Sequence, residues 1–177
     1  MARNHYAVLG LGSFGAKLAV ALARAGNTVL VVDIDQQRVD DLRDKVTEAI
    51  IADVSNEEVV RELNVRKFDA VILGMSSHFE DQVLALTLLK QEGVRKVIVK
   101  ANTTIQERIL FRLGADEVFQ PEQDVAERLA RRLTMDNITD LFEFKGSAIA
   151  EVTRTFLFFA VIRSSSLNVC PARTLFC

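Results

Sequence analysis

Short β-branched apolar runs alternate with longer amphipathic runs over the first two thirds of the chain. This alternation is typical of βαβ units around a parallel sheet, and it predicts six strands. The expected strands are residues 6–9, 29–33, 49–52, 70–73, 97–100 and 117–119. Runs such as Val-Leu-Val-Val and Val-Ile-Val are apolar without interruption, which indicates strands covered by helices on both faces.

These elements predict an α/β fold with a doubly wound, six-stranded parallel sheet. Its usual strand order is 3-2-1-4-5-6, with the ligand crevice at the carboxyl ends of the first and fourth strands. Helices are expected to begin near Ser13, Asp35, Asn56, Phe79, Thr104 and Pro121. Asp35 and Ser55 are candidate N-caps, and Gly26, Gly93 and Gly114 are candidate helix ends.

One expected helix carries apolar residues nearly all round. Residues 83–89 read Val-Leu-Ala-Leu-Thr-Leu-Leu, a pattern that a helix with one wet face would not have. A second partner is therefore expected, either the carboxyl-terminal segment of the same chain or a second copy in a homodimer.

The pattern changes after Leu133, which predicts a domain boundary near residue 134. We expect a nucleotide-binding domain at residues 1–134, and a linker with the start of a second lobe at residues 135–153. Residues 154–177 contain an apolar block and a run of three serines without periodicity, and we expect them to be an atypical, disordered tail.

Composition excludes several classes of function. The formal net charge is -2 and the pI is about 5.8, so the chain has no bulk attraction for nucleic acid. Residues 156–162, the longest apolar stretch outside the first strand, fall far short of the ~20 residues of a membrane span. Cys170 and Cys177 both lie near the end, and His5 and His78 have no metal-ligand spacing. We expect a cytoplasmic protein without a metal site.

Residues 10–15 read Gly-Leu-Gly-Ser-Phe-Gly, which matches G-x-G-x-x-G. The motif follows a predicted strand and opens an amphipathic helix, the context that a dinucleotide-binding Rossmann domain requires. Gly10 permits the tight turn, Gly12 lets a pyrophosphate approach the backbone, and Gly15 lets helix and strand pack closely. Backbone N–H groups at Ser13 and Phe14 would then face the phosphates.

Asp33 ends the second predicted strand, eighteen residues after Gly15. A carboxylate there can accept hydrogen bonds from both ribose hydroxyls of an adenosine and would repel a 2′-phosphate, so NADP is disfavoured. Asp33 as a mere strand-end residue is the alternative. The ends of the third and fourth strands complete the predicted site, with Asp53, Val54, Gly74, Met75 and Ser76. Asp53 either contacts the adenine amino group or caps the following helix.

Catalytic groups are missing from this pattern. Tyr6 is the only tyrosine, so the Tyr-x-x-x-Lys pair of short-chain dehydrogenases is excluded. No Ser/His/Asp or Cys/His arrangement appears, and the residues after 134 are too few for a substrate domain. The sequence therefore predicts a nucleotide-binding sensor and not an enzyme. The alternatives are the NAD-binding half of a metabolic dehydrogenase and a module that senses the NADH/NAD ratio.

Taken together, these segments resemble the RCK N-terminal (KTN) domain of regulatory subunits of Trk/Ktr-type potassium uptake systems. The resemblance rests on residues 6–15, 31–35, 68–72, 99–101, 113–116 and 120–122, and it covers about residues 4–140. It implies a cytosolic subunit whose homodimers assemble into a ring under a membrane potassium transporter. Exchange of ATP for ADP would reshape the ring and gate ion flow.

The resemblance also bears on individual residues. It places Lys100 and Glu122 near the crevice and the dimer contact, and Lys100 among the cofactor-binding residues. Several family members have arginine where this chain has Ser13, so ATP, ADP and NAD(H) all remain candidate ligands. The family's second lobe normally continues after Thr153, where the likeness stops, so the carboxyl-terminal segment is expected to be truncated or frame-shifted.

Overall fold

The computed structural model describes residues 3–75, 78–134, 138–144, 147–152 and 161–162. It divides into two compact units, residues 1–124 and 125–177. The division falls inside a helix, before the boundary expected near residue 134, and that domain boundary stays a prediction. Among the described residues, none of the helices has both the length and the apolar character that crossing a membrane requires.

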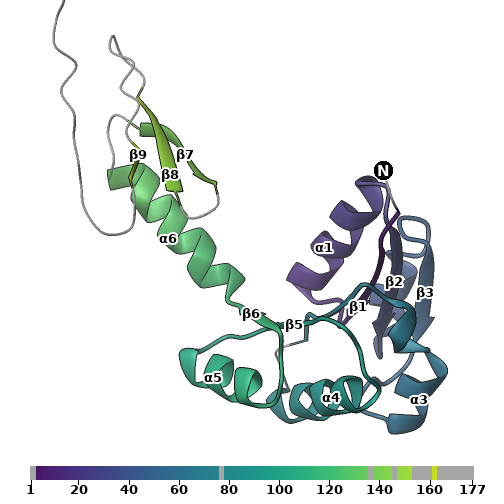
Figure 1. The fold of residues 1–177 in the computed structure, drawn as a ribbon. Coiled ribbons are helices and arrows are strands. Elements are labelled where there is room, and N and C mark those ends of the chain that lie inside the picture. Colours follow the sequence, from purple (N-terminus) through teal and green to yellow (C-terminus); the bar gives the residue numbers. More distant parts are fainter. Residues whose placement is uncertain (1–2, 76–77, 135–137, 145–146, 153–160, 163–177) are drawn as a thin grey trace, which may run out of the picture. The chain divides into compact units, whose positions relative to one another are not determined.

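The first unit is built on a six-stranded sheet, shown in Figure 1. Its strands are β1 (His5–Leu9), β2 (Thr28–Asp33), β3 (Glu48–Ile51), β4 (Ala70–Leu73), β5 (Val97–Lys100) and β6 (Glu117–Phe119). Every neighbouring pair is parallel, and the order is β3-β2-β1-β4-β5-β6. The predicted fold class is confirmed, and each strand lies within one residue of its expected bounds.

Helices follow the strands in turn. They are α1 (Ser13–Arg24), α2 (Gln36–Asp40), α3 (Glu57–Glu62), α4 (Phe79–Gln91), α5 (Thr104–Arg112) and α6 (Pro121–Thr134), with a 3-10 turn at Val65–Lys67. Asp35 caps α2 as predicted, because its side chain accepts the N–H groups of Gln37 and Arg38. The prediction of Ser55 as a cap is wrong: Asn56 caps α3 by accepting the N–H of Glu58.

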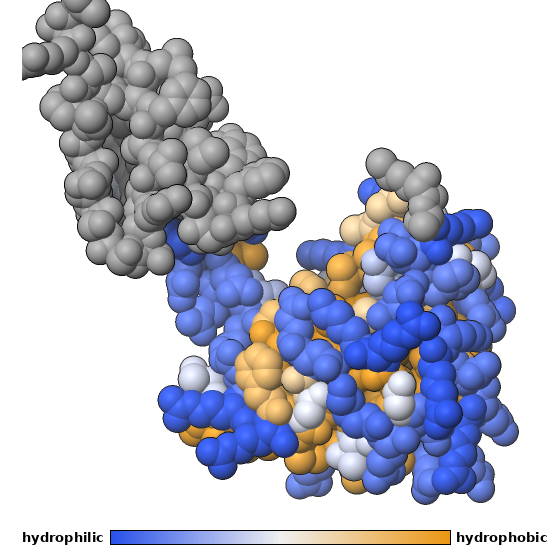
Figure 2. Space-filling view, in the orientation of Figure 1, coloured by the Kyte–Doolittle hydropathy of each residue, from blue (hydrophilic) through white to orange (hydrophobic). Residues whose placement is uncertain are grey.

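Two buried clusters cover the two faces of the sheet. Along β1, Val8 packs in one cluster with Ala19 of α1, while Ala7 and Leu9 pack in the other with Leu86 of α4. The strands are therefore sandwiched between helix layers, which explains their unbroken apolar runs. Polar residues dominate the face seen in Figure 2, with apolar groups showing between them.

Helix α4 is only partly covered within the first unit. It packs on α3 and β5 and buries Ala85, Leu86 and Leu89. Leu84 stays 52% exposed. The second partner expected for this helix remains a prediction.

The second unit contains a three-stranded antiparallel sheet in the order β7-β8-β9. These strands are Ile138–Phe144, Ser147–Val152 and Val161–Ile162. Apart from β9, the predicted tail at residues 154–177 lies outside the described residues.

Candidate functional site

Three glycines pack against one another where β1 turns into α1. A Cβ on Gly15 would lie 2.1 Å from the carbonyl oxygen of Gly10, and a Cβ on Gly74 would lie 2.7 Å from the same atom. Gly10 itself has a φ of +91°, which side chains rarely tolerate, and a Cβ there would meet the backbone nitrogen of Met75 at 2.6 Å. The turn is thus held so closely against the start of α1 and the end of β4 that no side chain fits.

Gly12 differs from these three glycines. It is the N-cap of α1, and a Cβ built on it would meet no atom of the described chain within 4 Å. The first turn of α1 contains no acidic residue. Because the first N–H groups of a helix lack intrahelical partners, the open space beside Gly12 can accept an anion.

The carboxylate of Asp33 connects this loop to the end of β2. Oδ2 accepts the backbone N–H of Leu11 at 2.5 Å, and Oδ1 accepts the N–H of Asp35 at 2.9 Å. The residue is only 8% exposed. Each carboxylate oxygen has two lone pairs, so Asp33 can hold the loop and still accept a bond from a ligand.

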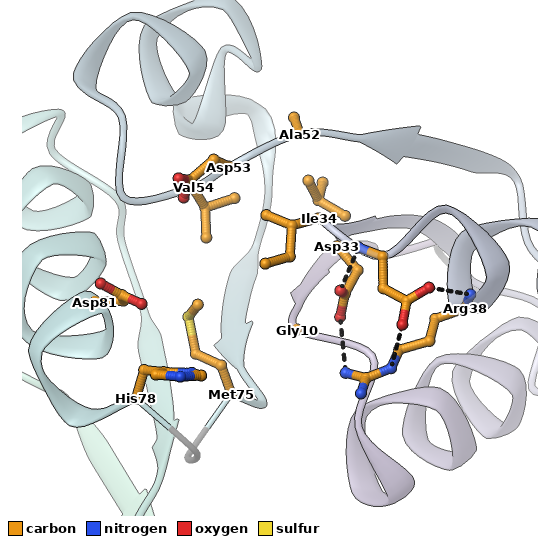
Figure 3. A pocket seen from close by; sticks show the side chains of 12 residues that line it. Gly10, Asp33, Ile34, Arg38, Ala52, Asp53, Val54, Met75, His78 and Asp81 are labelled. Atoms are coloured by element: carbon orange, nitrogen blue, oxygen red, sulfur yellow. Dashed lines mark hydrogen bonds and ion pairs between the residues drawn. The ribbon is translucent and has the colours of Figure 1, made fainter.

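A cavity of about 240 Å³ opens beside Asp33 at the carboxyl ends of the strands. Its lining comes from the segments that follow β1, β2, β3 and β4, as Figure 3 shows. The lining residues are Gly10, Val32, Asp33, Ile34, Asp35, Arg38, Ala52, Asp53, Val54, Met75, His78 and Asp81. Ligand pockets usually have about 300–1,000 Å³, so this cavity suits one portion of a nucleotide.

The charges around the cavity are mostly negative. Four carboxylates line it, and the facing basic side chains are Arg38 and His78. The carboxylates are Asp33, Asp35, Asp53 and Asp81. Such a wall favours the hydroxyl and amino groups of a nucleoside over its phosphates, whereas the start of α1 favours phosphates.

Asp53 has a structural task in the turn before α3. Its Oδ1 accepts both the N–H of Ser55, at 2.9 Å, and the hydroxyl of Ser55, at 2.7 Å. The residue is exposed and lines the cavity. A contact with adenine remains a prediction beside this turn-forming role.

Lys100 and Phe14 are predicted site residues outside the cavity lining. The side chain of Lys100 is 9% exposed, and its Nζ donates to Oε1 of Glu122 at 2.7 Å. This hydrogen bond holds the pKa of the Glu122 carboxyl below its usual value. The ring of Phe14 lies 4.7 Å from that of Phe119, centroid to centroid. Lys100 thus connects the end of β5 to α6, and Phe14 connects the start of α1 to β6.

A buried glutamine joins the cavity wall to Lys100. Gln82 of α4 is 1% exposed, and its Nε2 donates to the carbonyl oxygens of Met75, at 2.5 Å, and Lys100, at 2.7 Å. It therefore holds together the carboxyl ends of β4 and β5.

The structure brings part of the predicted set into one place. Gly10, Asp33, Asp53, Val54 and Met75 line a single cavity. The other predicted glycines and Ser13 lie in or against the neighbouring turn. Gly12 and Ser13 stand at the start of α1, and Gly15 and Gly74 pack against Gly10. Ser76 lies outside the described residues.

Seven lining residues were not among the predicted site residues: Val32, Ile34, Asp35, Arg38, Ala52, His78 and Asp81. Arg38 lies one turn after the Asp35 cap, and His78 and Asp81 stand at the start of α4. The rule that ligands bind beyond the ends of the first and fourth strands would have found the two α4 residues. Among the described residues, no group of three or more His, Cys, Asp or Glu side chains is arranged to hold a metal ion.

The TrkA-N domain model matches residues 6–121. Ktr system potassium uptake protein C of Bacillus subtilis (strain 168) is 34% identical over 80% of this chain and 64% of its own length. Ktr system potassium uptake protein A of Vibrio alginolyticus is 37% identical over 83% of this chain and 66% of its own length. The chain thus spans about two thirds of these curated relatives.

Solved structures share the fold. The NAD(P)-binding domain of an exopolyphosphatase-related protein from Archaeoglobus fulgidus has a TM-score of 0.66 and 26% identity, covering 75% of this chain and 98% of that domain. The GsuK channel bound to NAD has a TM-score of 0.60 and 18% identity, covering 85% of this chain and 28% of that one. GsuK bound to ADP has a TM-score of 0.57 and 15% identity, covering 67% of this chain and 31% of that one.

The resemblance drawn from the sequence motifs is confirmed by the family match, which spans the glycine turn, the cavity and all six strands of the parallel sheet. This chain belongs to the TrkA-N domain family.

Proposed function

We propose that this chain is a nucleotide-sensing, non-enzymatic regulatory subunit of a potassium uptake transporter. The observation that carries the proposal is the cavity beside an open helix start that has no side-chain cap, with a buried carboxylate at the edge of the cavity. The curated relatives support it, because their names place them in Ktr potassium uptake systems. In this proposal residues 1–134 form the sensing domain, and the chain works at the inner face of the plasma membrane through its transporter.

The ligand in this proposal is an adenine nucleotide, with ATP, ADP and NAD(H) as candidates. Its phosphates lie against the N–H groups at Gly12, Ser13, Phe14 and Gly15, where the helix dipole favours an anion. Its ribose meets Asp33. NAD and ADP are ligands named for the GsuK neighbours. NADP is disfavoured, because Asp33 and Asp35 would face its 2′-phosphate.

In this proposal the end of the third strand lies at the adenine, and the end of the fourth strand lies at the ribose-phosphate. Asp53 and Val54 flank the adenine, and Gly74, Met75 and Ser76 border the ribose-phosphate. Lys100 acts through its ion pair with Glu122 at the edge of the site.

Signalling requires two states that the ligands bind differently. A ligand can shift an equilibrium only by its difference in affinity for the two states. In this proposal the states are two arrangements of a homodimer within a ring, and the phosphate contacts at the glycine turn differ between ATP and ADP.

Calorimetric titration of the purified chain with ATP, ADP, AMP and NAD(H) tests the binding step. We expect saturable binding with an accompanying rise in melting temperature, because a ligand selective for the folded state stabilises it. Asp33→Ala should remove most of this binding. Asp40→Ala is the matched control, because Asp40 is exposed on α2 and does not line the cavity. An absence of binding at millimolar concentration of all these ligands overturns the proposal.

A second candidate is an NAD-binding module, either half of a dehydrogenase or a sensor of the NADH/NAD ratio. The 26% identity to the NAD(P)-binding domain from Archaeoglobus fulgidus favours it. In the same titration, tighter binding of ATP and ADP than of NAD(H) would count against the second candidate, whereas tighter binding of NAD(H) is compatible with both. Hydride transfer in a reconstituted mixture would identify the dehydrogenase version.

A further inference from the structure

Arg38 stands at the edge of the cavity beside Asp33. It belongs to α2, lines the cavity, and has a side chain that is 54% exposed. One guanidinium nitrogen, Nη1, lies 3.8 Å from Oδ2 of Asp33, and Nε lies 3.2 Å from Oδ2 of Asp35. Figure 3 shows the guanidinium between these two carboxylates and the glycine turn.

Asp35 anchors this arginine. Its Oδ1 accepts the N–H groups of Gln37 and Arg38 at the start of α2, and its Oδ2 faces Nε of Arg38. The carboxylate is therefore fixed by the helix that it caps, and it holds one side of the guanidinium. One terminal nitrogen of the planar fork, Nη1, faces Asp33, as the dashed line in Figure 3 shows.

The contact between Arg38 and Asp33 is an incomplete one. At 3.8 Å it is longer than a hydrogen bond, so it leaves a donor on Arg38 and acceptor capacity on Asp33. A small group that both accepts and donates would satisfy the two side chains together. A hydroxyl has this property, since it offers one O–H donor and two lone pairs.

We propose that Arg38 determines specificity for an unmodified ribose, by donating to the 2′-oxygen of the nucleotide while Asp33 accepts from the same hydroxyl. A 2′-deoxyribose leaves both side chains without this partner. A 2′-phosphate would bring two negative charges against Asp33 and Asp35, with one guanidinium to offset them. The proposal rests on nucleotide binding at this site, and it adds Arg38 to the ligand contacts.

The test combines a change in the protein with a change in the ligand. Dissociation constants are measured by calorimetry for ADP and 2′-deoxy-ADP, each with the native chain and with Arg38→Ala. The native chain should bind ADP about tenfold more tightly than 2′-deoxy-ADP, as expected for hydrogen bonds to charged groups. Arg38→Ala should weaken ADP binding about fivefold and change 2′-deoxy-ADP binding less than twofold, so that discrimination falls to about twofold.

Arg43→Ala is the matched control, because Arg43 is similarly exposed and pairs with Asp40 away from the cavity. It should leave both dissociation constants unchanged. Arg38→Met, which keeps an unbranched apolar stem on α2, should reproduce the result of Arg38→Ala. A purely structural role for Arg38 would weaken both ligands by the same factor, and that result, or no change for either ligand, overturns the proposal. If the native chain binds neither ADP nor 2′-deoxy-ADP, the proposal for Arg38 is overturned, while the proposed function still depends on the titrations with ATP, AMP and NAD(H).

Discussion

The glycine turn and the acid-lined cavity lie side by side in the site but are built by different means. In the turn, backbone atoms lie so close together that Gly10, Gly15 and Gly74 admit no Cβ. In the cavity, the walls are side chains, and several also stabilise their own loops: Asp33 holds Leu11, and Asp53 holds Ser55. The shape of the turn is thus set by backbone packing that leaves no room for side chains. The shape of the cavity is set by side chains that both line it and hydrogen-bond to nearby loops.

This difference predicts how each region responds to mutation. A methyl group in the packed part of the turn should damage folding, whereas a methyl group in its open part should damage only binding. Changes in the cavity wall should affect stability and binding together wherever a side chain carries both tasks.

The largest effect is expected at Gly15. In Gly15→Ala the new Cβ would lie 2.1 Å from the Gly10 carbonyl oxygen, a backbone atom that cannot move aside cheaply. We expect a loss of about 3 kcal/mol in the free energy of unfolding, near the upper end of overpacking costs. Urea denaturation measures it. A loss below about 0.5 kcal/mol would show that the turn is looser than this structure has it.

Gln82→Leu should have the next largest effect, in the wall of the cavity. It removes the donor shared by the Met75 and Lys100 carbonyl groups, and each buried acceptor left without a partner is costly. We expect about 2 kcal/mol of destabilisation in the same denaturation experiment. Gln91→Leu, at the exposed end of α4, is the matched control and should change stability little.

Gly12→Ala should separate binding from folding within the glycine turn. Its φ of -62° suits any residue, and a Cβ meets no described atom within 4 Å. Stability without ligand should therefore stay native, while ADP affinity falls about tenfold, or 1.4 kcal/mol, because the methyl group occupies the phosphate's approach. Native affinity in this variant would contradict the placement of the phosphates.

The sequence could predict the turn better than the cavity. The G-x-G-x-x-G spacing and its place between a predicted strand and a predicted helix were enough to predict the tight turn at Gly10 and the close packing at Gly15, and the structure shows both. The central strands could be predicted equally well, because strands buried on both faces are largely apolar, whereas the edge strands β3 and β6 each begin with an exposed glutamate. Arg38 was missed because an exposed arginine on a short helix carries no local signal, and only the fold brings it beside Asp33.

The hydrogen bond between Lys100 and Glu122 also could not be predicted from the sequence. A lysine at the end of a buried strand is compatible with phosphate binding, and only the three-dimensional structure shows its ion pair with Glu122, twenty-two residues further along the chain. The alternative prediction for Asp53, that it caps the following helix, is wrong, because Asn56 caps α3. Asp53 instead accepts two hydrogen bonds from Ser55 in the turn before that helix, and its contact with adenine stays a prediction.

The smallest expected effect concerns pH and Glu122. The hydrogen bond from Lys100 lowers the pKa of the Glu122 carboxyl, so its contribution to stability is present above the unfolded-state pKa of about 4.3 and is lost as pH falls through the lower folded-state pKa. The contribution should be well under about 1 kcal/mol, since the Glu122 side chain is 67% exposed. Comparing the melting temperature of Glu122→Gln with that of the native chain between pH 3 and pH 7 measures it, and an equal difference at all pH values would contradict it.

A crystal structure of the chain with ADP would show directly where the nucleotide binds. We expect the ribose hydroxyls within hydrogen-bonding distance of Asp33 and the phosphates against the N–H groups that follow Gly12. An ADP molecule bound elsewhere, or one whose phosphates lie among the carboxylates of the cavity, would contradict this expectation.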